Sequence, residues 1–424
     1  QIFKNPFLDL SLQDTQIPLK KVGSFSEKWG SPLSPEFEIK GTADLLLSLK
    51  GTIQEMGITG NFFFDQAHLG YGTLFKKEKN VPGNISWNCK FNQQTLNIEE
   101  ILIKIASSDL KIYGNVNIES PLDIRLNLKS NRLEGASWLL PSASAAGLVK
   151  KGNPGQTKTA SKPAHSASTL PQARINFNVE EGEIREFRFS KLKGFFSFQR
   201  GILRLSPISF QLAEGTYHGQ INLNMNQEPP PFQISSNIKN LNVNTLISSQ
   251  TAMKNIVEGR FFSNLSLKGM GLTWEVIRGN INGEGFIRLE EGHLPRFRLQ
   301  EGIAELLNIS PGELRSPNGT PIKELKGTIK VRNGKIYSDN LNLDLEDINL
   351  SGKGFVALDQ TLSFRIIAEL DSQLANRLSL DQGIGKTFLQ GPSGKTIIPL
   401  LLTGTLKEPK IAPDGETLAR MATK

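Results

Sequence analysis

Apolar and polar residues alternate along most of this chain. Between Phe37 and Ile53 the odd positions are apolar or Gly, while the even positions are mainly polar. Similar runs begin at Tyr217, Ile277 and Leu362. A period of two residues indicates a β-strand with one apolar face and one polar face. Gly and Asn residues between the runs are suited to turns and bulges. The pattern therefore predicts a mainly β protein with antiparallel sheets.

Part of this pattern occurs twice. The sequence Leu-Ser-Leu-Lys-Gly at Leu47–Gly51 recurs at Leu265–Gly269, and each copy is followed by a His-Leu pair, at His68 and His293. An enzyme site rarely repeats in this way. A structure that adds similar strand units does repeat, because a single unit cannot bury its own apolar face.

Helical patterns are few. The clearest covers 299–307, where apolar residues recur at helical spacing, and weaker ones cover 244–257 and 372–380. These segments are too short to cover a large sheet. We therefore expect the apolar face to fold on itself, to pack on a second sheet, or to enclose something apolar from outside.

The composition of one segment divides the chain into three parts. Residues 141–173 are rich in Pro, Ser, Ala, Gly and Lys and nearly lack large apolar side chains. Such a segment buries too little surface to offset its ordering entropy, which predicts a disordered linker or a surface insertion. We expect a divergent β-repeat module over 1–140 and a second β-module over 174–424.

Charge and cysteine usage exclude several kinds of functional site. The net charge is +8, but basic and acidic residues are interleaved, which favours a solvated surface over a nucleic-acid site. The single Cys, Cys89, excludes an internal disulfide and lies on the apolar phase of a predicted strand. No apolar run reaches the ~18 residues of a membrane span. The chain starts at Gln1, and we expect an upstream signal or anchor.

Motifs for catalysis or cofactors are incomplete. Gly391–Thr396 resembles the end of a phosphate loop, but Leu389 stands where its first Gly is needed. The glycines of Gly352–Ala357 lie inside a predicted strand rather than at a strand-to-helix turn. The four His residues have no partner at metal-ligand spacing. We expect no enzyme, no cofactor, no metal and no nucleic-acid partner.

The C-terminal part, from about Phe189 to Asp414, resembles the AsmA-like family of bacterial envelope proteins, a group that includes TamB-like and YhdP-like members. The resemblance rests on the order and spacing of several segments, above all Leu350–Asp359 followed by Ile398–Lys410. It implies elongated, curled antiparallel sheets with an apolar groove. It also implies a periplasmic location, an upstream inner-membrane anchor and a role in outer-membrane homeostasis.

Two functions remain open from the sequence. One is a non-catalytic groove that binds or conducts phospholipid acyl chains between the inner and outer membranes. The other is a structural scaffold or assembly factor for outer-membrane proteins, with a dry β core. A glycan binder is a third class, for which the scattered Trp residues give little support. The candidates for a lipid groove are apolar residues on alternating phases: Leu265, Leu267, Ile277, Ile281, Ile287, Leu341, Leu343, Leu345, Phe364 and Ile366.

Overall fold

The chain folds into two compact units, Gln1–Phe210 and Gln211–Lys424, which we call unit 1 and unit 2. The structure, a computed structural model, describes residues 6–20, 37–71, 75–134, 170–184, 187–247, 257–295, 299, 303, 319–345, 347–377 and 395–422. The division between the units falls inside strand β13 (Ile202–Leu212), whereas the sequence places a linker at 141–173. Residues 141–169 lie outside the described residues, and a strand already begins at Gln172.

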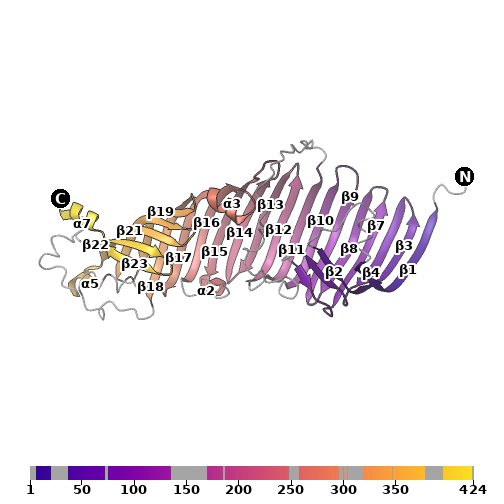
Figure 1. Cartoon of the computed structure of the whole chain (residues 1–424), viewed down its shortest axis with the longest axis horizontal. Helices are drawn as coiled ribbons and strands as arrows, with labels where there is room; N and C mark the ends of the chain where they lie inside the picture. Colours follow the sequence, from indigo (N-terminus) through magenta and orange to yellow (C-terminus); the bar gives the residue numbers. More distant parts are fainter. Residues whose placement is uncertain are drawn as a thin grey trace, which may run out of the picture. The chain divides into compact units, whose positions relative to one another are not determined.

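The predicted mainly β fold is confirmed: among the described residues, twenty strands form one sheet and three form a second, small sheet (Figure 1). In unit 1 the large sheet contains β1 (Phe7–Pro18), β3 (Thr42–Thr52), β4 (Glu55–Phe63), β7 (Gly83–Asn92), β8 (Thr95–Ile105), β9 (Ser108–Asn117), β10 (Asp123–Glu134), β11 (Gln172–Ile184) and β12 (Phe187–Gln199). The small sheet contains β2 (Phe37–Lys40), β5 (His68–Tyr71) and β6 (Phe75–Lys77).

Unit 2 continues with strands and short helices. Its strands are β14 (Gly215–Asn224), β15 (Pro231–Asn242), β16 (Glu258–Met270), β17 (Asn282–Leu294), β18 (Thr320–Arg332), β19 (Lys335–Asp344), β20 (Ile348–Ala357), β21 (Thr361–Leu370), β22 (Thr396–Thr405) and β23 (Pro409–Pro413). The helices bounded in the described chain are α2 (Val243–Ile247), α3 (Trp274–Asn280), α5 (Ser372–Arg377) and α7 (Gly415–Ala422).

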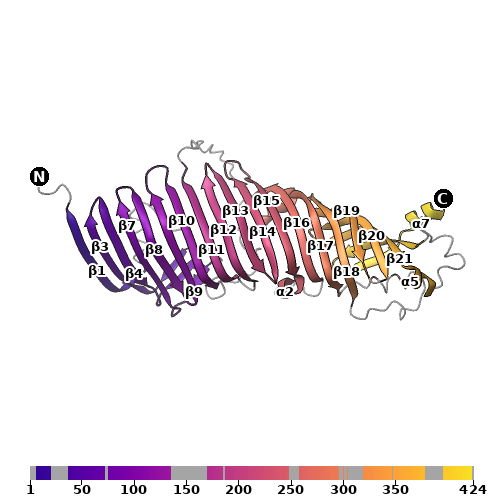
Figure 2. The same ribbon diagram turned by 180° about the vertical axis from the view of Figure 1, so that it is seen from behind.

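Neighbouring strands pair almost entirely in an antiparallel manner. In unit 1 the described pairings run from β1 through β3, β4, β7, β8 and β9 to β10, and β11 pairs with β12. The exception is β10 with β11, which are parallel. In unit 2 each strand from β14 to β23 pairs antiparallel with the next (Figure 2). Because opposed residues in a ladder share a face, the alternation of each strand extends across its neighbours.

The small sheet packs at one end of the unit 1 strands. Its Ile39 and Leu69 contact a buried cluster made of Leu19, Ala43, Phe64 and Ala67. Lys77 of β6 is fully buried there, and its Nζ donates to the carbonyl oxygens of Phe64 at 2.8 Å and Ala67 at 3.0 Å. Burial lowers the pKa of Lys77. Together these contacts fix the small sheet against the ends of the large one.

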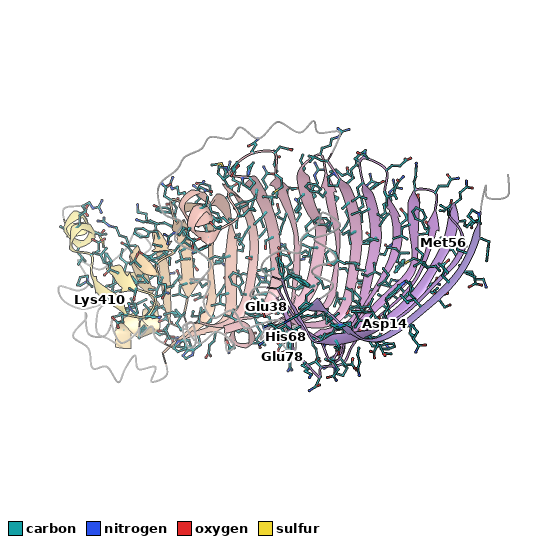
Figure 3. All side chains as sticks on the ribbon, turned by 45° about the vertical axis from the view of Figure 1, so that its right-hand side comes forward. Asp14, Glu38, Met56, His68, Glu78 and Lys410 are labelled. Carbon is teal, nitrogen blue, oxygen red and sulfur yellow. The ribbon has the colours of Figure 1, made fainter. Side chains whose placement is uncertain are left out.

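His68 of the small sheet lies next to Glu38 and Glu78 (Figure 3). Its Nδ1 is 3.0 Å from Oε2 of Glu78. In the second copy of the repeat, His293 lies 3.7 Å from Glu258. The repeated His-Leu pair therefore places each imidazole beside a carboxylate at the end of a strand. Neither His lies in a group of three or more possible metal ligands among the described residues.

The expected helices are present in part. Leu299 and Ile303 are helical and buried, α2 begins at Val243, and α5 covers Ser372–Arg377. Val257, at the end of the second predicted segment, is not helical, and the remainder of those segments lies outside the described residues. The strand expected around Ile277 is wrong, because Trp274–Asn280 form helix α3. The amide of Ile277 donates to the carbonyl of Thr273, and that of Ile281 to Ile277, which are helical bonds. No described helix is long and apolar enough to cross a bilayer.

Candidate functional site: the apolar face of the sheet

The apolar side chains of unit 1 gather on one face of the sheet in regular columns. Two columns run across nine strands at its centre. The first contains Leu10, Leu49, Ile58, Cys89, Ile98, Gly114, Leu126, Ile175 and Phe196; the second contains Leu12, Leu47, Gly60, Trp87, Ile101, Ile112, Leu128, Phe177 and Gly194. We call this surface the unit 1 apolar face. With strands ~4.8 Å apart, it extends for about 40 Å.

Most of this face is only half-buried. Cys89 and Ile98 are buried, whereas Leu10 and Leu12 on β1 remain 54% and 52% exposed. The side chains of the two columns belong to neither of the buried clusters found in the described part of the chain. In a sandwich these positions would be sealed by a second sheet. Here they form an apolar surface that stays accessible to a ligand.

The surface of this face is uneven because large side chains lie next to glycines. Gly60 of β4 lies opposite Trp87 of β7, and the indole ring passes over the glycine. A Cβ added at Gly60 would lie 2.2 Å from Cζ2 of Trp87. The same arrangement occurs in unit 2, where Gly283 pairs with Leu267 and Gly285 pairs with Leu265. Glycine at these positions lets a large neighbour lie flat on the sheet.

The first half of unit 2 presents a comparable open face. Leu265 and Leu267 on β16 and Ile287 on β17 point to the same side as Ile221 and Ile234, and all five are half-buried. Three of the predicted groove residues therefore lie on an accessible apolar surface. Because Leu265 and Leu267 correspond to Leu47 and Leu49 in the repeat, both copies of the phrase contribute to an open face.

The second half of unit 2 is closed by its own side chains. Leu343, Leu345 and Phe364 are buried in a cluster that includes Leu299, Ile303, Leu370 and Ile398. Leu341 and Ile366 pack against this cluster. Five predicted groove residues thus belong to or border a dry core. The two alternatives left open by the sequence, an open face and a dry core, both occur, at different places along the chain.

The last two predicted residues lie at the rim. Ile277 is half-buried in α3, so it is not part of a strand face. Ile281 follows α3 directly and is also half-buried. It precedes Gly283 by two residues and lies directly before β17, in line with the apolar phase of that strand.

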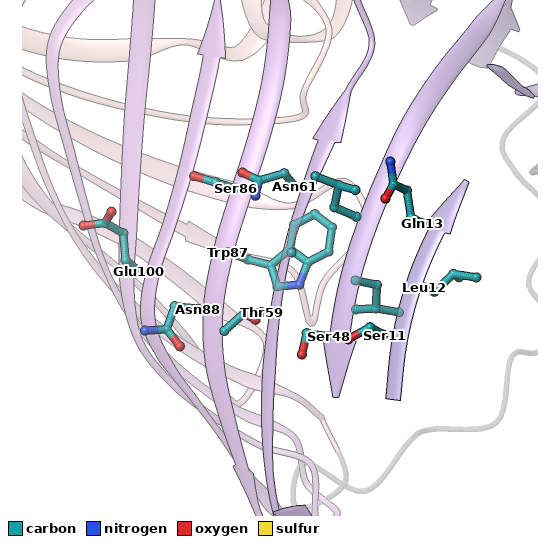
Figure 4. A pocket seen from close by; sticks show the side chains of 13 residues that line it. Ser11, Leu12, Gln13, Ser48, Thr59, Asn61, Ser86, Trp87, Asn88 and Glu100 are labelled. Carbon is teal, nitrogen blue, oxygen red and sulfur yellow. The ribbon is translucent and has the colours of Figure 1, made fainter. Parts of the chain in front are cut away.

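The opposite face of the sheet is polar and shallowly hollowed. One hollow in unit 1, of about 690 Å³, is bordered by hydroxyl and amide side chains from neighbouring strands, among them Ser48, Thr59, Asn61, Ser86 and Asn88 (Figure 4). A second, of about 520 Å³, lies in unit 2 beside Lys268, Glu284 and Lys330. The lining of the first hollow also includes Leu12, Leu47, Gly60 and Trp87 of the second column.

The described residues contain no group of three or more possible metal ligands. Burial raises the pKa of the Cys89 thiol, with the Glu99 carboxylate adding to the effect, so the thiolate is disfavoured. Cys89 therefore contributes to this surface as an apolar side chain. The chemistry available on the face is that of aliphatic and aromatic contact.

Sequence reasoning placed the groove only in the C-terminal half and missed the unit 1 apolar face. The signal was present in the alternation of Leu45, Leu47 and Leu49 and in Ile101 with Ile103. The sequence alone does not show which of these alternating segments become neighbouring strands. The columns can be seen only when the registers of all nine strands are combined.

Comparison with known families gives one match. Residues 172–341 match the AsmA family, a region that runs from β11 to β19 and includes the open part of unit 2. The match supports an AsmA-like assignment. No curated protein and no solved structure matches this chain.

Proposed function

From the premise that this chain is AsmA-like, we propose that it is a non-catalytic envelope protein that binds phospholipid acyl chains along its open apolar faces. The observation that supports this most is the unit 1 apolar face, where two columns of apolar residues and glycines, most of them half-exposed, run across nine strands. Large apolar surfaces left open on a soluble domain mark binding sites. The long, narrow form of the columns suits a hydrocarbon chain.

The energetics favour such a ligand. Each methylene removed from water contributes about 0.8 kcal/mol, so partial burial of an acyl chain of about 16 carbons contributes several kcal/mol. No single residue needs a chemical role, because the hydrophobic effect is non-directional. The headgroup would stay at the wet rim, where turn residues are polar or charged.

The closed cluster in unit 2 limits where the ligand lies. Leu343, Leu345 and Phe364 leave no room beside them, so the acyl chains would use the unit 1 face and the region of Leu265, Leu267 and Ile287. The closed part then stabilises the fold without taking part in binding.

Location and partners follow from the AsmA-like premise. We expect the protein in the periplasm of a Gram-negative-type envelope, tethered to the inner membrane by an upstream anchor. Acyl chains carried on its apolar faces would then move between the two membranes and contribute to outer-membrane homeostasis. Under the alternative scaffold function, which the dry core of unit 2 favours, the partners would be outer-membrane proteins.

The test uses two adjacent residues on β8 that point to opposite faces. Ile101 pairs with Trp87 and Ile112 on the apolar face, whereas Leu102 pairs with Ser86 and Lys111 on the polar face. Both side chains are half-buried. The purified chain is extracted with organic solvent, and its phospholipid is quantified by mass spectrometry.

We expect near-stoichiometric phospholipid in the unmodified protein and in Leu102→Asp, and a loss of about tenfold in Ile101→Asp, because a carboxylate on the apolar face disfavours a hydrocarbon neighbour. Circular dichroism establishes that both variants fold. Lipid-free unmodified protein, or equal lipid loss in both folded variants, would refute the proposal and favour the scaffold.

A further inference from the structure

One rim of unit 2 carries a cluster of exposed apolar side chains that the acyl-binding face does not explain. The rim is formed by the turns between β14 and β15, β16 and β17, β18 and β19, β20 and β21, and β22 and β23. These turns are hydrogen-bonded to one another in places: the amide of Gly271 donates to Pro230 O, and that of Leu358 to Gly334 O. Helix α3 lies on this rim, at the end of the strands (Figure 1).

The cluster is centred on α3 and the residues before it. Leu272 is 62% exposed, Trp274 55%, Met270 44% and Val276 42%. Met225, in the turn before β15, and Leu358, in the turn after β20, are exposed on the same rim. We call these six residues the rim cluster. Isolated exposed apolar residues are common, but several within one short segment mark an interaction site.

The opposite ends of the strands differ. The described apolar side chains there turn inward: Val243, Leu345 and Leu374 are buried. Among the described residues, the two rims of unit 2 therefore differ in the exposure of their large apolar side chains. Turns of unit 1 expose single apolar residues such as Ile53 and Ile118.

The segment holding the rim cluster is fixed in place. Oδ1 of Asn280 accepts a hydrogen bond from the amide of Met270 at 2.7 Å, and its Nδ2 donates to Val276 O at 2.7 Å. Gly271 has φ of +100°, and a Cβ there would clash with the Val276 side chain. These contacts hold Leu272 and Trp274 outward without a flexible loop.

The surroundings are suited to a phospholipid surface. Trp and aliphatic side chains with nearby cations are typical of segments that lie at the boundary of headgroups and acyl chains. Helix α3 and the neighbouring turn carry Arg278, Arg332 and Lys335 against one acidic residue, Glu275. Acidic residues also occur on this rim: Glu228 lies in the turn before β15, and Asp359, next to Leu358, interacts electrostatically with Lys335. Asn280 of α3 lies beside Gly269 at the end of β16, on the side of the sheet that carries Phe232, Ile234 and Leu267.

We propose that the rim cluster of unit 2 inserts shallowly into a phospholipid bilayer, with Trp274 and Leu272 in the interface and Arg278, Arg332 and Lys335 at the headgroups. A bilayer at this rim gives its acyl chains a direct route to the adjacent open face. The inference goes beyond acyl binding and does not require it, because the rim cluster and the unit 1 apolar face share no residue.

Vesicle flotation tests the inference. The purified chain is mixed with vesicles of phosphatidylethanolamine and phosphatidylglycerol, or of phosphatidylcholine alone, and floated on a density gradient. We expect flotation with both vesicles and more with the anionic ones. The double variant Leu272→Asp/Trp274→Asp is expected to lower partitioning about tenfold, because two interfacial apolar contacts are lost. Phe286→Asp, a change at an exposed aromatic residue in the middle of β17, is the matched control.

A fluorescence measurement gives an independent readout. With Trp29, Trp87 and Trp138 replaced by Phe, the emission of Trp274 should shift to the blue on adding vesicles. Absence of flotation, equal flotation of the double variant, or no shift of the Trp274 emission would overturn the inference. A concentration-dependent dimer that the double variant abolishes, without vesicle binding, would assign the rim cluster to self-association instead. If the double variant loses flotation but keeps its bound phospholipid, membrane contact and acyl binding are separate properties, and the acyl-binding proposal is unaffected.

Discussion

At the residue scale, the same apolar side chain serves different purposes in different places. Phe364 and Leu267 both lie on the apolar face of unit 2 and both were predicted to line a groove. Phe364 is 7% exposed inside the closed cluster, whereas Leu267 is half-buried and faces Gly283. Alternation in the sequence identifies the face of each residue. It does not reveal whether other side chains cover that face, because the cover comes from distant segments such as Leu299 and Ile303.

These two residues give a paired prediction. Phe364→Ala should destabilise unit 2 by about 3–5 kcal/mol, because it opens a cavity in a packed cluster. Leu267→Ala should have a clearly smaller effect on stability, because its side chain is already partly in water, yet it should lower phospholipid content. Urea midpoints and lipid quantification on the same preparations measure both. Similar destabilisation by the two substitutions would mean that the face around Leu267 is as closed as the one around Phe364.

At the scale of elements, the sequence predicts strands well and their partners poorly. The alternation around Leu265 and around Leu362 corresponds to β16 and β21. The parallel pairing of β10 with β11 has no local signal, because it depends on how the chain between the two strands returns. Helix α3 was missed because Ile277 and Ile281 fit a period of two and a period of four equally. A short apolar run cannot distinguish the two by periodicity alone.

Helix α7 gives a prediction about pH. Asp414 is buried just before the helix; its Oδ2 accepts a hydrogen bond from the Thr417 hydroxyl at 2.7 Å, and its Oδ1 accepts one from the Thr417 amide at 3.2 Å. The Thr417 hydroxyl, then the Thr417 amide and Arg365, hold the pKa of Asp414 below its usual range. Since the folded pKa is depressed, the stabilisation is present above the unfolded pKa of about 4 and is lost as the pH falls through the folded value.

We therefore expect Asp414→Ala to destabilise this end of unit 2 by about 1 kcal/mol at pH 7, the usual cost of losing a helix cap. The difference in free energy of unfolding between Asp414→Ala and the unmodified protein should shrink as the pH is lowered towards 3. Asp414→Asn keeps an oxygen acceptor but not the charge, so its stability at pH 7 should lie between those of the other two proteins. Urea midpoints across this pH range measure the effect. A difference that stays constant down to pH 3 would contradict the assigned role of the carboxylate.

At the scale of the whole molecule, stability and binding are assigned to different regions. The closed cluster of unit 2 contains most of the fully buried apolar side chains among the described residues, and the central columns of unit 1 remain half-exposed. Local stability follows buried apolar contact, so the two regions should open with different free energies. A binding face that must admit a hydrocarbon chain belongs to the region with fewer sealed contacts.

Hydrogen–deuterium exchange tests this division directly. In lipid-free protein the amides of β20, β21 and β22 should exchange more slowly than those of β3, β4 and β8, because the former strands carry the closed cluster. Adding phospholipid should slow exchange in β3, β4 and β8, since a bound chain must leave before those strands open, and should leave β20 to β22 unchanged. Ile101→Asp should remove the lipid effect while preserving the lipid-free pattern. Slower exchange confined to β20–β22 on adding lipid would place the ligand in unit 2 and contradict the assignment of the unit 1 apolar face.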